Sequence, residues 1–199
     1  MGSAFYDYED PGPEITADLF FEIIDLPENQ NKTYELIDGY IIAMSGNTTP
    51  NHQRISGCIA REIGNYLKGK KCEVFQELNV YLFKEDIGKC KNVFQPDVLI
   101  CCDKSKLTDR GCEGTPEFIV EVISASTSWR DYSVKLKRYM DFGVKEYWIV
   151  DMFSKQIMVY KSSGDNPPAC LIYTFADKVR VGVLEDLEID FREISETLG

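Results

Sequence analysis

The sequence predicts a mixed α/β fold, an α+β arrangement in which helices flank a mixed sheet, and three patterns predict it. The stretch 33–44 consists of two apolar runs on either side of Asp38-Gly39, which is a strong signal for a β-hairpin near the N-terminus. Apolar residues recur every fourth position over 55–67 and predict an amphipathic helix. Two later apolar runs are typical of strands buried on both faces, 98–102 and 118–123.

The other elements follow from local signals taken along the chain. Thr16 can cap a short helix that ends at Pro27. The segment 73–83 alternates enough to predict one strand with a single buried face. No Gly or Pro occurs between Asp131 and Gly143, which predicts a helix there. Short strands are expected at 146–150, 156–160, 171–175 and 179–183, followed by a polar tail with Leu187, Ile189 and Phe191 as its anchors.

The length and composition fit one domain. A chain of 199 residues with 44% apolar content can bury a substantial single core. Residues 1–15 are rich in acidic residues and proline and are expected to form a flexible lead-in. The sequence therefore predicts one domain over 16–199.

The charge of the chain argues against a partner that carries many phosphates. The formal net charge is -11 and the sequence pI is near 4.6, whereas proteins that bind nucleic acid neutralise phosphates with basic side chains. Local basic clusters can coexist with an acidic remainder, and carboxylates at a metal site are partly neutralised by the metal. Two such clusters occur, at 68–71 and at 130–138.

The cysteines and the N-terminus indicate a compartment. Seven cysteines are an odd number, none has Cys-x-x-Cys spacing, and the chain has one histidine, so a structural zinc site is not expected. The N-terminus lacks the basic start and apolar run of a signal peptide, and no apolar stretch is long enough to span a membrane. The simplest interpretation is a reduced, cytoplasmic protein with free thiols and no membrane partner.

Two acidic residues occur where buried strands are predicted. Glu121 interrupts the run 118–123, and Asp97 follows Pro96 at the start of another apolar run. An ionised carboxylate there is costly unless a cation meets it. Oxygen ligands of this kind suit magnesium, manganese or calcium. Each acid alone could equally cap a helix or pair with Arg130 or Lys135.

A lysine on the following predicted helix is the candidate basic partner. Lys135 flanks the helix face that packs on the sheet, so it could reach back toward the carboxylates and orient or deprotonate a water molecule. The alternative is a solvated lysine that pairs with Asp131 four residues earlier. Asp131 itself is either a helix-start acid favoured by the helix dipole or a partner of Lys135.

Three further residues can be interpreted in two ways. His52, the single histidine, stands at a predicted helix start and is either a general base or a packing histidine. Glu35 in the hairpin and Glu62 on the helix could each supply another carboxylate. Glutamates are common on strand and helix surfaces, so an ordinary surface role is favoured for both.

Several of these segments together resemble one enzyme family. An acid, a second acid 24 residues later in a buried strand, and a nearby lysine are similar to the PD-(D/E)xK nuclease superfamily, and the match to its Uma-type restriction endonuclease family is closer. The segments that carry the resemblance are Tyr34–Gly39, His52–Arg54, Pro96–Val98, Pro116–Ser124, Asp131 with Lys135 and Tyr139, and Gly143–Asp151. The resemblance implies a restriction-endonuclease-like core, DNA cleavage with a divalent metal, and a homodimer.

One position departs from the superfamily motif. Ile123 stands two residues after Glu121, where the motif places its lysine. The family's usual substitute is a lysine on the next helix, which here is Lys135. In the favoured hypothesis, Mg²⁺ or Mn²⁺ is held by Asp97, Glu121 and the Val122 carbonyl, and Lys135 assists attack on a DNA phosphodiester. Two alternatives stay open: an inactive nucleic-acid- or partner-binding module on a nuclease scaffold, and a metal-dependent hydrolase of RNA or small phosphoesters.

Overall fold

A computed structural model describes residues 14–30, 32–44, 49–123, 131–163 and 166–199. It confirms the mixed α/β class with mixed sheets and helices. The chain forms two compact units: unit 1 comprises Met1–Asn47, Asn79–Gln95 and Lys106–Thr115, and unit 2 comprises Thr48–Leu78, Pro96–Ser105 and Pro116–Gly199. Most of the predicted lead-in lies outside the described residues. One domain over 16–199 stays a prediction.

Unit 1 is built on the predicted hairpin. β1 (Thr33–Ile37) and β2 (Tyr40–Met44) pair antiparallel from Ile37 opposite Tyr40, and Asp38 and Gly39 have φ of 52° and 85°. Two positive φ values in sequence are the geometry that Asp-Gly favours in a tight hairpin turn. The hairpin prediction is confirmed, residue for residue. The strands β4 (Val80–Tyr81), β5 (Val93–Phe94), β7 (Leu107–Thr108) and β8 (Gly111–Glu113) complete a sheet in the order β2-β1-β5-β4-β8-β7.

Helix α1 (Ala17–Ile24) packs on this sheet and confirms the helix expected after Thr16. Phe20 is buried and belongs to the same apolar cluster as Leu36, Ile41 and Tyr81. Two short 3₁₀ turns, η1 (Pro27–Asn29) and η2 (Ile87–Lys89), connect the elements of the unit. Unit 1 therefore has a small core of its own.

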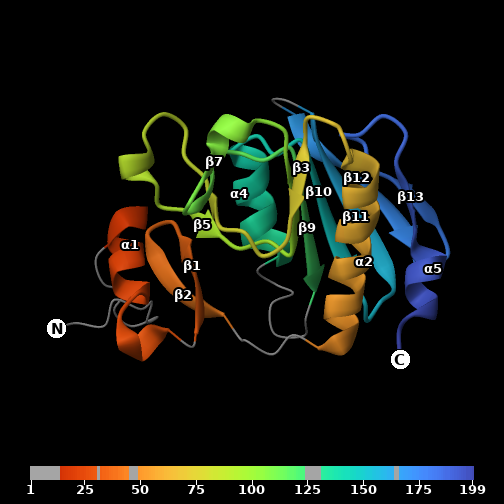
Figure 1. Cartoon of the computed structure of the whole chain (residues 1–199), viewed down its shortest axis with the longest axis horizontal. Coiled ribbons are helices and arrows are strands. Elements are labelled where there is room, and N and C mark those ends of the chain that lie inside the picture. The colour runs from red at the N-terminus through yellow and green to blue at the C-terminus, as the bar shows by residue number, and fades with distance from the viewer. Residues whose placement is uncertain (1–13, 31, 45–48, 124–130, 164–165) are drawn as a thin grey trace. The chain divides into compact units, whose positions relative to one another are not determined.

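Unit 2 contains a second six-stranded sheet, in the order β12-β11-β10-β9-β6-β3. β9 and β10 pair in parallel and the other neighbours are antiparallel, so the sheet is mixed (Figure 1). The bounds are β3 (Glu73–Phe75), β6 (Val98–Cys101), β9 (Phe118–Ile123), β10 (Glu146–Asp151), β11 (Gln156–Ser163) and β12 (Asn166–Thr174).

The long helix α2 (Pro50–Leu67) confirms the helix that the four-residue apolar repeat predicted. Its stripe from Ile55 to Leu67 packs in one core cluster with Val120 and Val122 of β9. Successive side chains of a strand point to opposite faces. Glu121, which lies between these two valines, accordingly points away from α2 and toward the segment that follows residue 130.

That segment begins as a π-helical turn, η4 (Asp131–Lys135), and continues as α4 (Leu136–Asp141) before Gly143 at φ 87°. The helix predicted there is confirmed, with the wider π turn as its start. π turns occur mostly where a side chain must be aimed at a functional or strained position. Here the turn ends at Lys135, and Tyr139 packs edge-on against Tyr147 with ring centroids 5.0 Å apart.

Two element predictions are wrong. The segment 73–83 is not one strand: β3 belongs to the sheet of unit 2 and β4 to the sheet of unit 1, with Glu77 at a φ of 52° between them. The predicted polar tail forms β14 (Glu188–Asp190), which pairs with β13 (Lys178–Arg180), and then helix α5 (Phe191–Glu196). Phe191 of this tail is fully buried, with its ring 5.5 Å from that of Phe175.

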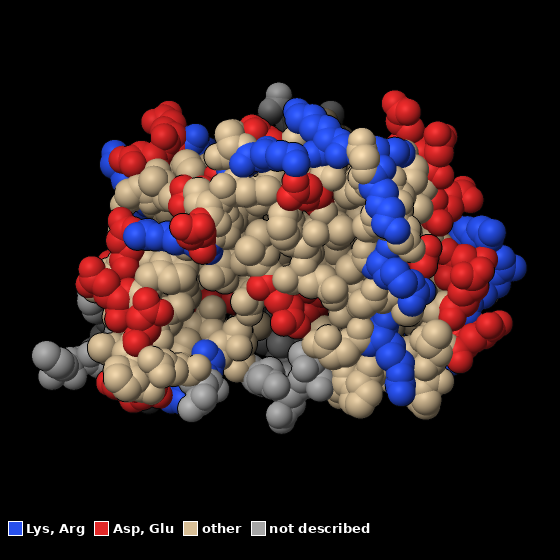
Figure 2. Space-filling model, viewed as in Figure 1, with Lys and Arg blue, Asp and Glu red and all other residues tan. Residues whose placement is uncertain are grey.

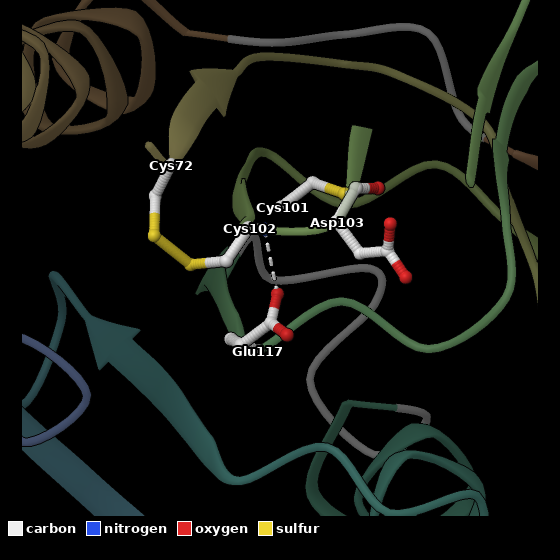
Figure 3. The surroundings of a disulfide bond; sticks show 5 residues. All are labelled: Cys72, Cys101, Cys102, Asp103 and Glu117. Carbon is white, nitrogen blue, oxygen red and sulfur yellow. Dashed lines mark hydrogen bonds between the residues drawn. A yellow bond between two sulfur atoms is a disulfide. The ribbon is translucent and has the colours of Figure 1, made fainter. Parts of the chain in front are cut away.

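The prediction that all thiols are free is also wrong. Cys72, just before β3, and Cys102, just after β6, form a disulfide (Figure 3). Their positions continue the β3–β6 register, in which Glu73 lies opposite Cys101. Glu117 accepts a hydrogen bond from the Cys102 N–H at 2.8 Å. In the described part of the chain, no disulfide is formed by Cys58, Cys90, Cys101, Cys112 or Cys170.

The predicted cytoplasmic location rested partly on free thiols, and it stays a prediction. None of the helices in the described part of the chain has the length and apolar character that crossing a bilayer requires.

Candidate active site

Asp97 stands at the start of β6, opposite the middle of β9. Val98 pairs with Val120 in the antiparallel β6–β9 ladder, so one step further along the ladder Asp97 faces Glu121. The Asp97 Oδ2 atom accepts a short hydrogen bond of 2.6 Å from the Val122 N–H. This bond fixes the carboxylate against the strand that carries the second acid, so the two acids predicted from the sequence lie at neighbouring positions in one sheet.

His52 is brought to the same carboxylate by the start of α2. Thr49 caps the helix by accepting the His52 N–H at 3.2 Å, and the His52 Nε2 lies 3.3 Å from Asp97 Oδ2. Burial works to lower the pKa of His52, but the hydrogen bond and the negative charge of Asp97 outweigh it, and the net pKa is raised above 6.5. Among the described residues, His52 Nδ1 has no hydrogen-bond partner.

Glu121 is buried together with its cation. Its Oε1 atom accepts hydrogen bonds of 2.9 Å from both Lys135 Nζ and Tyr139 O–H. Glu121 is 5% exposed, Lys135 2% and Tyr139 0%, so all three groups are removed from water. The cost of burying the acid is offset by a buried lysine and a phenol four residues apart on one helical segment.

These contacts decide between the two interpretations of Lys135 but not between those of Asp131. Lys135 is not a solvated surface residue, because its ammonium is buried against Glu121. Asp131 lies at the start of η4, and its side chain is outside what the structure describes, as is Arg130. The structure therefore gives Lys135 a carboxylate partner on the sheet, while the role of Asp131 stays a prediction.

Glu77 is a residue near this site that the sequence did not reveal. Its N–H donates to the carbonyl of Pro96 at 3.2 Å, its Oε1 accepts from Gln53 at 3.2 Å, and its charge contributes to the raised pKa of His52. A non-glycine residue at positive φ is uncommon and is enriched at functional sites. The alternating pattern of 73–83 concealed it, since nothing in that pattern marks a break.

The two other candidate glutamates differ in burial, so the surface role favoured for both is wrong for Glu35. Glu35 lies in β1 of unit 1, is 1% exposed, and accepts the Gln95 N–H at 3.2 Å. Glu62 lies on the outside of α2 and pairs with Arg61 at 3.1 Å, with its side chain 41% exposed. Glu62 therefore has the surface role that was favoured for it.

The donor chemistry at Asp97 and Glu121 suits a hard divalent cation. Two carboxylates and a nearby main-chain carbonyl, that of Val122, are oxygen donors of the kind magnesium takes, with water or phosphate oxygens completing the shell. In the described part of the chain, no hydrogen bond is donated to Asp97 Oδ1, so this oxygen is available to a ligand. The described residues include no group of three or more His, Cys, Asp or Glu side chains placed to hold a metal ion.

The mixed sheet, with two acids at facing positions and a buried lysine beside one of them, defines a protein of the restriction-endonuclease-like class. The family described as "Uma2: Putative restriction endonuclease" matches residues 20–192, which is most of the chain. The chain therefore belongs to the Uma2 family, as its resemblance indicated, and the family supports a nuclease.

Two relatives and one solved structure are similar to this chain. The chain is 28% identical to uncharacterized protein slr1290 of Synechocystis over 172 residues, 86% of each chain. It is 26% identical to uncharacterized protein sll1609 of the same organism over 148 residues, 72% of this chain and 80% of that protein. A crystal structure described as a putative nuclease belonging to DUF820 from Anabaena variabilis has the same fold, with a TM-score of 0.72 and 18% identity over 92% of this chain and 98% of that one.

Proposed function

We propose that this protein is a divalent-metal-dependent endonuclease that hydrolyses DNA phosphodiester bonds. The observation that carries the proposal is the Asp97 carboxylate held by the Val122 N–H beside Glu121, with Lys135 buried against Glu121. The Uma2 family supports a nuclease, and the donor set supports Mg²⁺ or Mn²⁺ as the ion. A homodimer is predicted by the family resemblance and stays a prediction.

Each residue has a role that its contacts suggest. Asp97, Glu121 and the Val122 carbonyl would hold the metal, which would supply Lewis-acid activation of the phosphate and of the attacking water. The Val122 N–H and His52 hold the Asp97 carboxylate in place. Lys135 and Tyr139 hold Glu121 in place, which makes them positioning residues.

Lys135 has a second possible role in the proposal because it carries a positive charge. Its ammonium lies 2.9 Å from Glu121 Oε1, so a phosphate bound at the metal would meet both the metal and this cation. The lysine would then stabilise charge that develops on the phosphate oxygens. Its near-complete burial restricts this role to a substrate that reaches the end of β9.

The second candidate is a nuclease scaffold that binds without cleaving. Ile123 occupies the position where the superfamily motif has its lysine, and the lysine that replaces it is already engaged by Glu121. Metal affinity separates the two candidates, because a scaffold without cleavage has no need to retain ligands for an ion.

The test combines metal binding with cleavage. Titration calorimetry with Mg²⁺ and Mn²⁺ and a plasmid-nicking assay would compare the wild-type protein with Asp97→Asn and with the matched control Glu188→Gln on β14. The Asn amide oxygen can still accept the Val122 N–H, so the fold is retained while one anionic ligand is lost. We expect Asp97→Asn to lose metal binding and nicking together, and Glu188→Gln to keep both.

Other outcomes of the metal-binding and nicking assays would change the assignment. Normal nicking by a folded Asp97→Asn protein would overturn the site. Metal binding by the wild type without nicking of DNA, but with hydrolysis of RNA or a small phosphoester, would keep the site and replace the substrate. No metal binding by the wild type would favour the inactive scaffold.

A further inference from the structure

The outer face of α2 carries basic residues at regular intervals. Arg54, Arg61 and Lys68 are seven residues apart, so they follow one another along one side of the helix with a drift of about 20° per step. All three are exposed, as is Lys71 just beyond the helix. These four residues are named the basic stripe, and Figure 2 shows basic side chains following one another over α2.

The charges of the basic stripe are largely uncompensated. Arg54 donates to the neutral amide of Asn51 at 2.8 Å, and the 64% exposed Arg61 pairs with Glu62, the one acidic residue of α2. In the part of the chain that the structure describes, Lys68 and Lys71 have no acidic partner within 4.0 Å. Nearby Lys70 stands over the Tyr66 ring, 3.1 Å from its centroid.

Most of the net negative charge of the chain is carried by unit 1. Unit 1 contains 14 of the 33 acidic residues but only 6 of the 22 basic ones, so it carries -8 of the formal charge of -11. Unit 2 carries the remaining -3, and its segment Thr48–Leu78 has five basic residues against Glu62, Glu73 and Glu77. The net charge that argues against DNA therefore does not describe the surface of α2.

The basic stripe begins near the end of α2 that carries His52. Arg54 lies two residues after His52, whose ring contacts Asp97. From Arg54 to Lys68 the helix rises about 21 Å, which corresponds to about six base pairs of duplex at 3.4 Å each. A polyanion that lay along this face would have one end at the turn of α2 that carries His52.

We propose that the basic stripe of α2 binds the phosphate backbone of duplex DNA and leads it to the Asp97 end of the helix. This inference rests on the proposed function. Its physical basis is charge complementarity, a sequence-independent attraction that depends on the release of counterions from DNA. A duplex is favoured over a single strand, because single-strand sites add aromatic rings on which bases stack. Tyr66 is the one aromatic residue of α2, and Lys70 covers it.

The experiment neutralises the basic stripe without changing the site. The triple variant Arg61→Gln, Lys68→Gln, Lys71→Gln is compared with the matched triple Lys145→Gln, Lys155→Gln, Lys178→Gln, exposed residues of unit 2 outside α2. Both triples change the net charge equally. Binding to a labelled duplex is measured by fluorescence anisotropy in EDTA at several salt concentrations, so that no cleavage occurs, and thermal melting checks that each variant is folded.

We expect the basic-stripe variant to bind at least about tenfold more weakly and its plot of log affinity against log salt to lose a slope of about 3, near 0.9 for each phosphate contact removed. The control variant should keep the wild-type slope. An unchanged slope in the basic-stripe variant, an equal loss in the control, or wild-type preference for single-stranded DNA or RNA over duplex would overturn the inference.

The experiments distinguish an error about the basic stripe from an error about the endonuclease activity. A wild-type protein that nicks DNA in a manner dependent on Asp97, but binds it without help from the basic stripe, would overturn only the basic stripe. A protein that binds duplex through the basic stripe but never nicks it would support the basic stripe and overturn the endonuclease.

Discussion

Glu121 and Lys135 form a buried ion pair, and each side chain can be tested by substitution. Glu121 and Lys135 would each be costly to bury alone, yet they meet at 2.9 Å with Tyr139 as a third partner. The pair therefore has two roles in the proposal, because it holds a metal ligand in place and it makes the position intolerant of a change to either partner.

The first prediction concerns that pair. Lys135→Met should lower the free energy of unfolding by about 3–5 kcal/mol, because Glu121 is left as an uncompensated buried carboxylate. The double variant Lys135→Met, Glu121→Gln should lose clearly less than the sum of the two single changes. Urea denaturation of the four proteins measures this coupling. Additive losses would mean that the two side chains do not interact as the structure shows.

A second buried carboxylate, Glu146, predicts the pH dependence of stability. Burial raises its pKa above 4.5, although hydrogen bonds from Gly182 and Trp148 oppose the rise. The folded protein consequently holds this proton to higher pH than the unfolded chain does. Between 4.5 and the raised pKa the folded state binds more protons, so the contribution of Glu146 to stability falls as pH rises through this window.

Glu146→Gln isolates that contribution. The difference in unfolding free energy between wild type and this variant should decline as pH increases from about 4 toward neutrality, measured by chemical denaturation at several pH values. The exposed Glu188→Gln provides the control and should give a flat difference. A wild-type advantage that grows with pH would show that the carboxylate is stabilised as an anion.

At the scale of elements, β3 is the weakest part of the sheet of unit 2. It has three residues, lies at the edge of the sheet, and is tied to β6 by the Cys72–Cys102 disulfide. A cross-link between residues 30 apart restricts the unfolded chain, which by loop entropy stabilises the fold by about 3 kcal/mol. Reduction should lower the melting temperature of wild type and leave that of Cys72→Ser, Cys102→Ser unchanged. An equal melting temperature for oxidised and reduced wild type would contradict this prediction.

The backbone of Glu77, in the turn after β3, is in a strained conformation. Glu77 adopts a φ of 52°, a conformation that costs a residue with a side chain about 1 kcal/mol relative to glycine. Glu77→Gly should relieve that cost, and it should also remove a negative charge that contributes to the raised pKa of His52. We expect unfolding free energy to be maintained or increased while the His52 pKa, measured by NMR titration, decreases. An unchanged His52 pKa would exclude the electrostatic contact.

At the scale of the whole molecule, net charge opposes compaction. With a charge of -11, the repulsion between carboxylates should be reduced by screening. Raising the salt concentration from about 10 to 200 mM at neutral pH should therefore increase the melting temperature, since about 200 mM salt shortens the screening length below 10 Å.

Reversing one exposed charge tests the same repulsion. Glu22 lies in the last turn of α1, where an acid opposes the helix dipole. Glu22→Lys should raise the melting temperature at low salt and weaken its salt dependence. A melting temperature that falls with salt would mean that attractive ion pairs dominate instead.

Elements with local signals could be predicted from the amino-acid sequence. Asp38-Gly39 specified the hairpin because its backbone conformation suits those two residues, the four-residue repeat specified α2, and an acid inside an apolar run marked Glu121 as a buried charge. The fold class and the family followed from these same segments. A short stretch of sequence is enough to predict an element when residues close in the chain determine its conformation.

Contacts between residues distant in the chain became visible in the folded structure. It placed Asp97 opposite Glu121 and joined Cys72 to Cys102, and both depend on strand register. It also gave Glu121 the ammonium of Lys135, which depends on how η4 packs against β9. It also divided 73–83 between two sheets at Glu77, although the alternation there continues without a break. Register and pairing are set by packing of the whole sheet, and the free energy of that packing is not contained in any short stretch of sequence.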